Sequence, residues 1–529
     1  MPNEHREVEA NYDADPAFEL PSLTELIAGD PGEVSPPRDV DHVDEEVVRE
    51  RLGSTYFDTA DLRLAAADVT LKRSTGGADT GWQLIVKAGD GANPDARLEL
   101  GRAARTVPAP LRNMVLARSR GAALVPVARI ETQRTSRRLV QRTGKVLAEV
   151  TDDLISAHRL LTPESSKEPS SITTAWRKIH VRVVEGDRAL LGVVDARLRK
   201  AGLATSDNAS NLDQFLDSLT DDANVPGQGR RKDLSVKSSA SAVVVAHLRE
   251  QAEELRNQDL LVRLDAPEGV HKMRVASRRL RSALTTFKPI FVDDTIGPLR
   301  DELKWLAGEL GAARDAEVMH ERLRRGIEAE NADELLGAVT QDMDTQMELA
   351  YRQAHDRVLA DLDSSRYRTL LTALDELVDS PPSTKKADRP ARKALPPLVA
   401  RSYAKVRHLM DKADARPGGA KREELLHEAR KASKRARYAA ESVSSAFGKP
   451  ATAFAAVMEG MQEELGEHRD SVVTRQRLLE LAREAPHSGT AFTYGRLHAL
   501  EEARGKQIRR HFLRAWKSAR KKSVHRWLT

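Results

Sequence analysis

The chain contains no cysteine among its 529 residues, which excludes a disulfide framework and any metal site built on thiolates. It also lacks any run of ~18 apolar residues, the length that a membrane-spanning helix needs. The acidic N-terminal stretch MPNEHREVEANYD has no apolar core of the kind that a signal peptide requires. These absences predict a cytoplasmic protein without a membrane span.

The charge of the chain is small in sum but unevenly distributed. The formal net charge is +5, and acidic residues dominate 39–50. Arginine and lysine instead cluster in two helical segments and in the C-terminal stretch 509–526. Such clustering favours an anionic partner. The length suffices for two or more domains at ~150 residues each.

Two segments far apart in the chain share one basic helical pattern: VHKMRVASRRLRSALTTF at 270–287 and LHEARKASKRARYAAESV at 426–443. His427 follows His271 by 156 residues (427 − 271). At ~100° per residue, the basic residues form one stripe of each helix and the apolar residues another. The basic stripes consist of His271, Arg274, Arg278 and Arg281 in the first copy and His427, Arg430, Lys434 and Arg437 in the second.

A second pair of segments repeats in the same order. LGAARD begins at Leu310, and LGEHRD begins at Leu465, 155 residues later (465 − 310). Two blocks repeated at nearly the same offset indicate duplicated helical units. If the units pack with pseudo-twofold symmetry, both basic stripes face one groove. The paired Arg-Asp steps have an equally good structural interpretation, in which the aspartate holds an arginine between helices.

Residues 1–216 are dominated by short segments in which charged and apolar residues alternate. Glycine-rich joints such as 74–81 separate these segments. Many short antiparallel strands at this spacing predict a closed β-barrel. Strands are expected at 7–12, 54–59, 69–73, 81–88, 128–142, 145–160 and 176–186, followed by a helix at 189–202.

Strand signals end at a polar segment containing proline and glycine, 217–236, which we interpret as an inter-domain linker. Residues 237–529 carry helical patterns only, and a proline-rich break at 381–397 divides them into two repeats, about 237–380 and 397–529. The predicted fold is therefore a two-domain α+β protein. It combines an N-terminal antiparallel β-barrel with a C-terminal all-α duplicated bundle of pseudo-twofold symmetry.

The N-terminal region resembles the CYTH family, which has a triphosphate-tunnel fold. The resemblance rests on Glu7-Val-Glu9, on YFDT at 56–59 followed by DLRL at 61–64, and on LAEVTDD at 147–153. It implies a tunnel in which carboxylates hold a divalent cation, Mg²⁺ or Mn²⁺, and basic side chains hold a triphosphate. The resemblance assigns metal binding to Glu7, Glu9, Glu149 and Asp152, and triphosphate binding to Lys72, Lys87, Arg129 and Arg134.

The sequence departs from the family pattern in its late strand. Lys178, His180 and Arg182 stand where the family reads approximately EIEVE. A cation site that exchanges carboxylates for basic residues should bind metal poorly. We favour a tunnel that has lost efficient catalysis and binds anions at most. The alternatives are a working metal-dependent triphosphatase, acting on tripolyphosphate or an organic triphosphate, and a purely structural or partner-binding barrel.

The C-terminal region resembles the CHAD family, a helical domain often fused behind CYTH. The resemblance rests on both copies of H-x-x-R-[VK]-A-S-[RK]-R and of LG-x-x-RD. It implies binding of inorganic polyphosphate in a basic groove, without chemistry, and association with polyphosphate granules. The residues that match by position are His271, Lys272, Arg274, Arg278, Arg279, Arg281 and Arg314, then His427, Arg430, Lys431, Lys434, Arg435, Arg437 and Arg469.

Polyphosphate suits these helices physically, because it is a flexible chain with about one charge per phosphate and no bases. Arginine or lysine at every third or fourth position supplies donors along a line. Nucleic acid is the alternative partner, since it has the same backbone charge, but single-strand binders usually add aromatic platforms. Phe287 and Tyr438 lie off the basic stripes. The paired histidines suit a phosphate better than a metal ion, which their cationic neighbours would repel.

Overall fold

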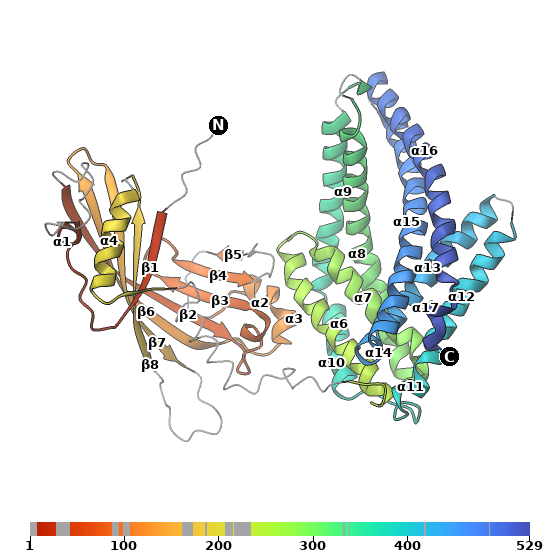
Figure 1. Cartoon of the computed structure of the whole chain (residues 1–529), viewed down its shortest axis with the longest axis horizontal. Helices are drawn as coiled ribbons and strands as arrows, with labels where there is room; N and C mark the ends of the chain where they lie inside the picture. The colour runs from red at the N-terminus through yellow and green to blue at the C-terminus, as the bar shows by residue number, and fades with distance from the viewer. Residues whose placement is uncertain are drawn as a thin grey trace. The chain divides into compact units, whose positions relative to one another are not determined.

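The computed structural model of the chain contains two compact units, Met1–Arg230 and Arg231–Thr529 (Figure 1). The predicted linker at 217–236 lies outside the described residues except for 234–236. In the part of the chain that is described, no helix is long and apolar enough to cross a membrane. The structure describes residues 8–27, 43–86, 95–98, 106–160, 173–185, 188–206, 215, 234–331, 334–337, 339–416, 419–485 and 487–528.

The N-terminal unit is built on one antiparallel sheet, whose described strands run in the order β5-β4-β3-β2-β6-β7-β8-β1-β9. The edge strands β5 and β9 are four and two residues long and share no ladder with each other in this described part. A closed barrel needs hydrogen-bond pairing between the first and last strands of the sheet. The described part of the sheet is therefore open, and the prediction of a closed barrel is wrong for these residues. The strands are β1 Val8–Ala14, β2 Val43–Asp58, β3 Val69–Thr75, β4 Gly81–Val86, β5 Asp95–Leu98, β6 Val125–Gln141, β7 Val146–Arg159, β8 Thr173–Val183 and β9 Ala204–Thr205.

Two helices pack on the β1, β7 and β8 end of this sheet: α1 (Leu23–Ile27) and α4 (Arg188–Lys200). Their apolar side chains form a buried cluster with residues of the strands, including Tyr12 and Ile179. The Tyr12 hydroxyl donates a hydrogen bond of 2.6 Å to Asp195 on α4. Burial and this carboxylate raise the pKa of Tyr12. The bond joins α4 to β1.

The YFDT motif forms a buried turn after β2. Asp58 is 2% exposed, and its carboxylate accepts backbone N–H groups of Thr59, Leu64 and Ala65 at 2.6, 2.9 and 2.9 Å. Burial raises the pKa of Asp58 to about 6, although these hydrogen bonds oppose the shift. The aspartate thus satisfies backbone donors that would otherwise be buried without partners. This motif of the family resemblance has a structural role.

Every regular element in the described residues of the C-terminal unit is a helix, as predicted, apart from the isolated β-bridges Ser239–Pro390 and Phe291–Ser383. Two helices of equal length, α8 and α15 with 36 residues each, are its longest elements. The helices are α6 Ala240–Arg263, α7 Gly269–Thr286, α8 Asp293–Glu328, α9 Val339–Leu362, α10 Ser365–Asp379, α11 Ala391–Ala394, α12 Pro396–Asp414, α13 Ala420–Glu441, α14 Ser444–Phe447, α15 Lys449–Glu484, α16 Ser488–Ala519 and α17 Lys522–His525.

The helices of this unit form two series with the same order of packing. α6, α7, α8 and α9 contact one another in chain order, and so do α12, α13, α15 and α16. The α8–α9 and α15–α16 pairs stand as two long hairpins in Figure 1. Leu323 and Met343 of the first hairpin share a buried cluster with Leu478 and Tyr494 of the second. The order of packing agrees with the predicted duplication, with α7 and α13 as equivalent helices.

Candidate functional site

The basic stripes of α7 and α13 come together. The pKa of Lys434 is lowered to about 6, mainly by burial and in addition by the positive charges of Arg278, Arg274 and Arg430. Two of these arginines belong to α7 and one to α13, so the interaction joins both copies. Burial also lowers the pKa of Arg278, with Arg274, Arg281 and Arg430 acting in the same direction.

His271 lies at the same place. Burial lowers its pKa, and the charges of Arg314, Lys434 and Arg274 add to the effect, whereas Glu268 opposes it. His271, Arg274, Arg278, Arg430 and Lys434 are all partly buried, and we call these five residues the convergent cluster. Like charges held in partly desolvated positions favour an anionic ligand, because it would relieve their mutual repulsion.

The Arg-Asp steps of α8 and α15 flank this cluster. Arg274 forms an ion pair with Asp315 at 3.6 Å. Burial raises the pKa of Asp470, Arg430 opposes that shift, and Asp315 contributes to it as a nearby negative charge. The two aspartates thus influence each other electrostatically, and each interacts with the arginine of its own copy. The interpretation of the aspartate as a clamp between helices holds for Arg274, which belongs to α7.

The glycine of each LG-x-x-RD motif, to which the sequence alone assigned no role, lies beside an arginine of the convergent cluster. A Cβ atom on Gly311 would lie 3.4 Å from Nε and Nη2 of Arg274. A Cβ atom on Gly466 would lie 3.3 Å and 3.4 Å from the same atoms of Arg430. The absent side chain leaves room for a guanidinium group in each copy. The signal was present in the sequence, since the glycine repeats with the Arg-Asp step.

The other residues predicted from the CHAD resemblance divide into two groups. Arg279 pairs with Glu441 at 3.2 Å, and Arg437 pairs with Glu441 and Glu459 at 2.7 and 2.8 Å. Arg314 pairs with Glu268 and Glu317 at 3.3 and 3.1 Å. These three arginines are therefore neutralised within the protein. Lys272, Lys431 and Arg435 are exposed, Arg281 and His427 are partly buried, and the side chain of Arg469 lies outside the described residues.

The predicted metal ligands of the sheet do not all share one face. Glu149 and Asp152 are three residues apart on an unbroken part of β7, so they point to opposite faces. Glu149 accepts hydrogen bonds from Arg138 at 3.1 Å and from Arg182 at 2.8 Å. Burial alone would raise the pKa of Glu149, but these two arginines hold it below its usual value.

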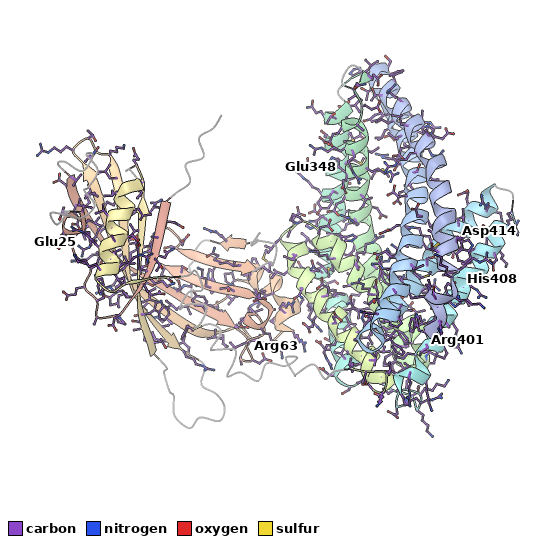
Figure 2. All side chains as sticks on the ribbon, in the orientation of Figure 1. Glu25, Arg63, Glu348, Arg401, His408 and Asp414 are labelled. Carbon is purple, nitrogen blue, oxygen red and sulfur yellow. The ribbon has the colours of Figure 1, made fainter. Side chains whose placement is uncertain are left out.

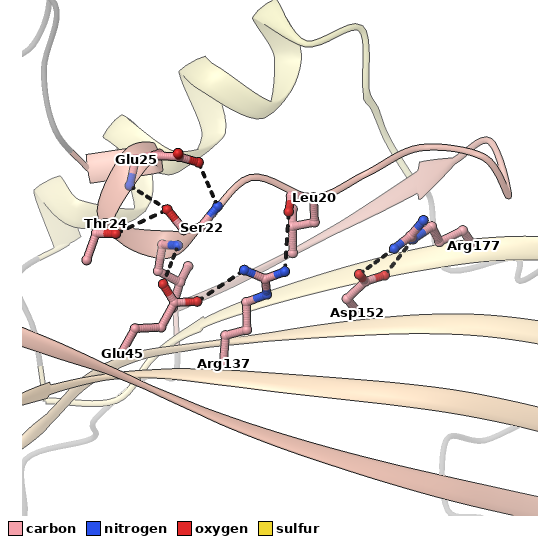
Figure 3. A network of polar contacts seen from close by, with 9 residues as sticks. Leu20, Ser22, Thr24, Glu25, Glu45, Arg137, Asp152 and Arg177 are labelled. Atoms are coloured by element: carbon pink, nitrogen blue, oxygen red, sulfur yellow. Dashed lines mark hydrogen bonds and ion pairs between the residues drawn. The ribbon is translucent and has the colours of Figure 1, made fainter.

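The other carboxylates of this predicted site are also paired. Arg177 donates two hydrogen bonds of 2.7 Å to Asp152 (Figure 3), and His180 lies 3.1 Å from Glu9. Glu7 lies outside the described residues. The described residues include no group of three or more side chains suited to hold a metal ion. The acid-to-base exchange on β8 thus places cations on the carboxylates, and these residues do not fit Mg²⁺ or Mn²⁺.

The predicted triphosphate ligands are likewise separated. Arg129 and Arg134 are five residues apart on β6 and point to opposite faces of the sheet. Arg134 donates two hydrogen bonds to Asp153, at 2.8 and 2.7 Å, and Arg129 pairs with Glu131 at 2.9 Å. Burial lowers the pKa of Lys72 on β3. Lys87 lies outside the described residues.

Comparisons with known proteins agree with the helical motifs. The family model of the CHAD domain matches residues 246–479. The Mycobacterium tuberculosis proteins MT2285 and Rv2226 are each 32% identical over 510 residues, which cover 94% of this chain and 93% of the relative. The solved CHAD domain of Ricinus communis is 26% identical, with a TM-score of 0.43, covering 55% of this chain and 96% of that chain. HpAC1 from Hippeastrum is 14% identical, with a TM-score of 0.21, covering 40% of this chain and 96% of that chain.

The glycine positions lead to a stability prediction. Alanine in a helix interior is favoured over glycine by up to ~1 kcal/mol. We expect Gly308→Ala on α8 and Gly460→Ala on α15 to raise the melting temperature, because a Cβ there meets nothing within 4 Å. Gly311→Ala and Gly466→Ala should raise it less, since each new methyl group would press on a guanidinium group at 3.3–3.4 Å. Thermal unfolding followed by circular dichroism tests this, and equal stabilisation at all four sites would contradict it.

The paired carboxylates lead to a prediction about metals. Glu9, Glu149, His180 and Arg182 share one face of the sheet. We expect Mn²⁺ to leave the melting temperature of the wild type unchanged and to raise that of the His180→Glu, Arg182→Glu variant, which gathers four carboxylates. A ligand at 100 times its Kd stabilises by ~2.7 kcal/mol. Adding Glu149→Gln should remove the gain. An Mn²⁺-dependent shift in the wild type would overturn the assignment.

Proposed function

Since this chain belongs to the family of the mycobacterial proteins MT2285 and Rv2226 and carries a CHAD domain, we propose that it binds inorganic polyphosphate through the convergent cluster. The observation that supports this proposal is the meeting of cations from two equivalent helices. Arg274 and Arg278 of α7 act on Lys434 of α13, although 156 residues separate the equivalent positions 278 and 434 (434 − 278). A linear polyanion gives each of these cations an oxygen to bind.

The chemistry of the cluster suits a phosphate chain. Arginine presents several N–H donors in a planar fork, which can bridge oxygens of neighbouring phosphoryl groups. Gly311 and Gly466 leave space for the guanidinium groups of Arg274 and Arg430 beside α8 and α15. Lys434 contributes a charge that becomes fully available once an anion offsets the surrounding arginines. The cluster therefore supplies positive charge and little shape selection, as a flexible polyanion requires.

A nucleic-acid partner is the second candidate, and the position of Tyr438 does not favour it. This ring is 4% exposed. The cationic groups of Lys434, Arg279 and Arg437 lie 5.7 to 5.8 Å from its centroid. The aromatic ring thus lies beneath cations and has no free face on which a base could stack.

A metal-dependent triphosphatase activity of the sheet is the third candidate. The pairing of Glu149, Asp152 and Glu9 with basic side chains does not favour it. We propose a non-catalytic N-terminal unit, with the helical unit as the polyphosphate receptor. Association of the protein with cytoplasmic polyphosphate granules follows if long chains occupy the convergent cluster.

Removal of the cluster should abolish tight binding. In a variant with alanine at Arg274, Arg278, Arg430 and Lys434, we expect affinity for long-chain polyphosphate to fall at least ~100-fold, since each charged hydrogen bond contributes ~1 kcal/mol or more. Isothermal titration calorimetry measures the loss.

The matched control removes the same charge from exposed positions of the same unit: Lys304, Arg357, Arg407 and Lys412. This control should retain most of the affinity of the wild type. Equal losses in the two variants would sink the assignment. Competition by RNA at equal phosphate concentration would favour the nucleic-acid candidate instead.

Binding should also depend on pH through Lys434. Its pKa of about 6 in the free protein must rise when an anion binds, so binding above pH 6 takes up a proton. We expect affinity to fall as the pH rises from 6 to 8, by up to ~10-fold per unit. Burial also lowers the pKa of His271 from its usual value.

The variant Lys434→Arg isolates this effect, because arginine remains charged throughout the window. It should bind polyphosphate with a flatter pH profile and with higher affinity than the wild type at pH 8. Titrations at pH 6, 7 and 8 measure both profiles. Identical slopes in the two proteins would show that Lys434 is not the group that couples binding to protons.

A further inference from the structure

A second cationic site lies at the C-terminal end of α7, outside the convergent cluster. An open pocket of about 330 Å³ is lined by the end of α7, the 3-10 turn Lys288–Ile290, α12 and α13, and we call it the α12 pocket. Figure 2 labels one of its residues, Arg401 on α12. Its described lining contains no carboxylate. The charged and hydroxyl residues of the lining are Thr285, Thr286, Lys288, Arg401, Ser402, Lys405 and Arg435.

The duplicated fold supplies an internal comparison for this pocket. At the offset of 156 residues that relates α7 to α13, Arg435 is equivalent to Arg279, and Thr285 is equivalent to Glu441 (435 − 279 and 441 − 285). Arg279 forms an ion pair with Glu441 across the two helices, at 3.2 Å. Arg435 and Thr285 line the α12 pocket together. A hydroxyl therefore stands where the equivalent site has a carboxylate.

One hydroxyl of the lining has no internal hydrogen-bond partner. Oγ1 of Thr286 is buried and has no hydrogen-bond partner among the described residues. Burial lowers the pKa of Arg281, and the charge of Arg435 adds to this shift. An unsatisfied buried hydroxyl and an excess of positive charge both favour an external anion at this place.

We propose that the α12 pocket binds a terminal phosphoryl group of a condensed phosphate, either as free pyrophosphate or at the end of a longer chain. The volume is at the low end of the ~300–1,000 Å³ found for ligand pockets, so the ligand is compact. A terminal phosphoryl group carries more charge than an internal one, up to about two negative charges. Arg401 and Lys405 of α12 and Arg435 of α13 surround that charge, and the hydroxyls of Thr286 and Ser402 supply neutral donors.

The pocket is separate from the site of the proposed function. None of its residues belongs to the convergent cluster, so binding at one site does not require the other. The proposal also gives Arg435 a role that differs from that of Lys434 beside it in the sequence. The two residues are one position apart on a helix and point in directions ~100° apart.

The test restores the carboxylate that the equivalent site has. Thr285→Glu places an acid beside Arg435, as Glu441 lies beside Arg279. We expect affinity for pyrophosphate to fall by ~10-fold or more, measured by isothermal titration calorimetry. Thr285→Gln is the matched control of equal size without charge and should bind nearly as the wild type does. Thr285 is exposed, so both variants should fold.

The variant with alanine at Arg274, Arg278, Arg430 and Lys434 separates this proposal from the proposed function. We expect it to retain pyrophosphate binding whether or not it loses long-chain polyphosphate. Loss of pyrophosphate binding in that variant, or unchanged binding in Thr285→Glu, would overturn the α12 pocket as the site.

Two further ligands identify what the pocket recognises. Cyclic trimetaphosphate has no terminal phosphoryl group and should bind poorly, and binding equal to that of pyrophosphate would contradict recognition of a chain end. Long-chain polyphosphate added to the cluster variant should displace pyrophosphate if chain ends are the source. Absence of displacement assigns the pocket to free pyrophosphate.

Discussion

The helical unit is organised around a repulsion. Arg274 and Arg278 of α7 meet Arg430 and Lys434 of α13 in partly buried positions, where their charges oppose one another. Burying these like charges together costs free energy in the folded protein. The packing of the surrounding helices nevertheless holds the four side chains in place. Equivalent packing of α7 on α8 and of α13 on α15 fixes both stripes, and Gly311 and Gly466 leave room for the guanidinium groups. The aspartates of the Arg-Asp steps offset part of the cost.

The sequence was sufficient to predict that the two basic stripes meet. It was not sufficient to predict which basic residues of the stripes belong to the convergent cluster. The matched phase of His271 and His427 predicted two equivalent helices, and the structure brings both basic faces to one place. Arg279 and Arg437 looked the same as their neighbours in the pattern. They differ because Glu441 and Glu459 reach them in the fold. Glu459 lies outside the repeated segments, and Glu441 stands where the first copy has Thr285. A helical pattern gives the direction of a side chain, whereas its partners depend on tertiary packing.

The N-terminal sheet also shows how far the sequence alone predicts the partners of a side chain. Basic side chains of β8 pair with carboxylates of the neighbouring strands: Arg182 with Glu149, Arg177 with Asp152 and His180 with Glu9. Glu149 and Asp152 cannot both belong to one ligand set, because residues three apart on a strand point to opposite faces of the sheet. That conflict was predictable from the sequence. The open edges were not, because strand closure depends on how far the short edge strands extend.

The duplication accounts for both the symmetric and the asymmetric parts of the helical unit. Where α7 meets α13, Arg274 and Arg278 of the first copy interact with their equivalents Arg430 and Lys434 of the second. A substitution in one copy therefore changes the charge that the other copy meets. Equivalent residues at the helix ends have different neighbours in the two copies. A substitution at such a position in one copy does not affect the other copy. Glu441 and Thr285 occupy one such equivalent pair of positions: one neutralises an arginine, and the other leaves a cavity beside it. A doubled fold can therefore keep a shared cationic centre while one of its ends becomes a separate site.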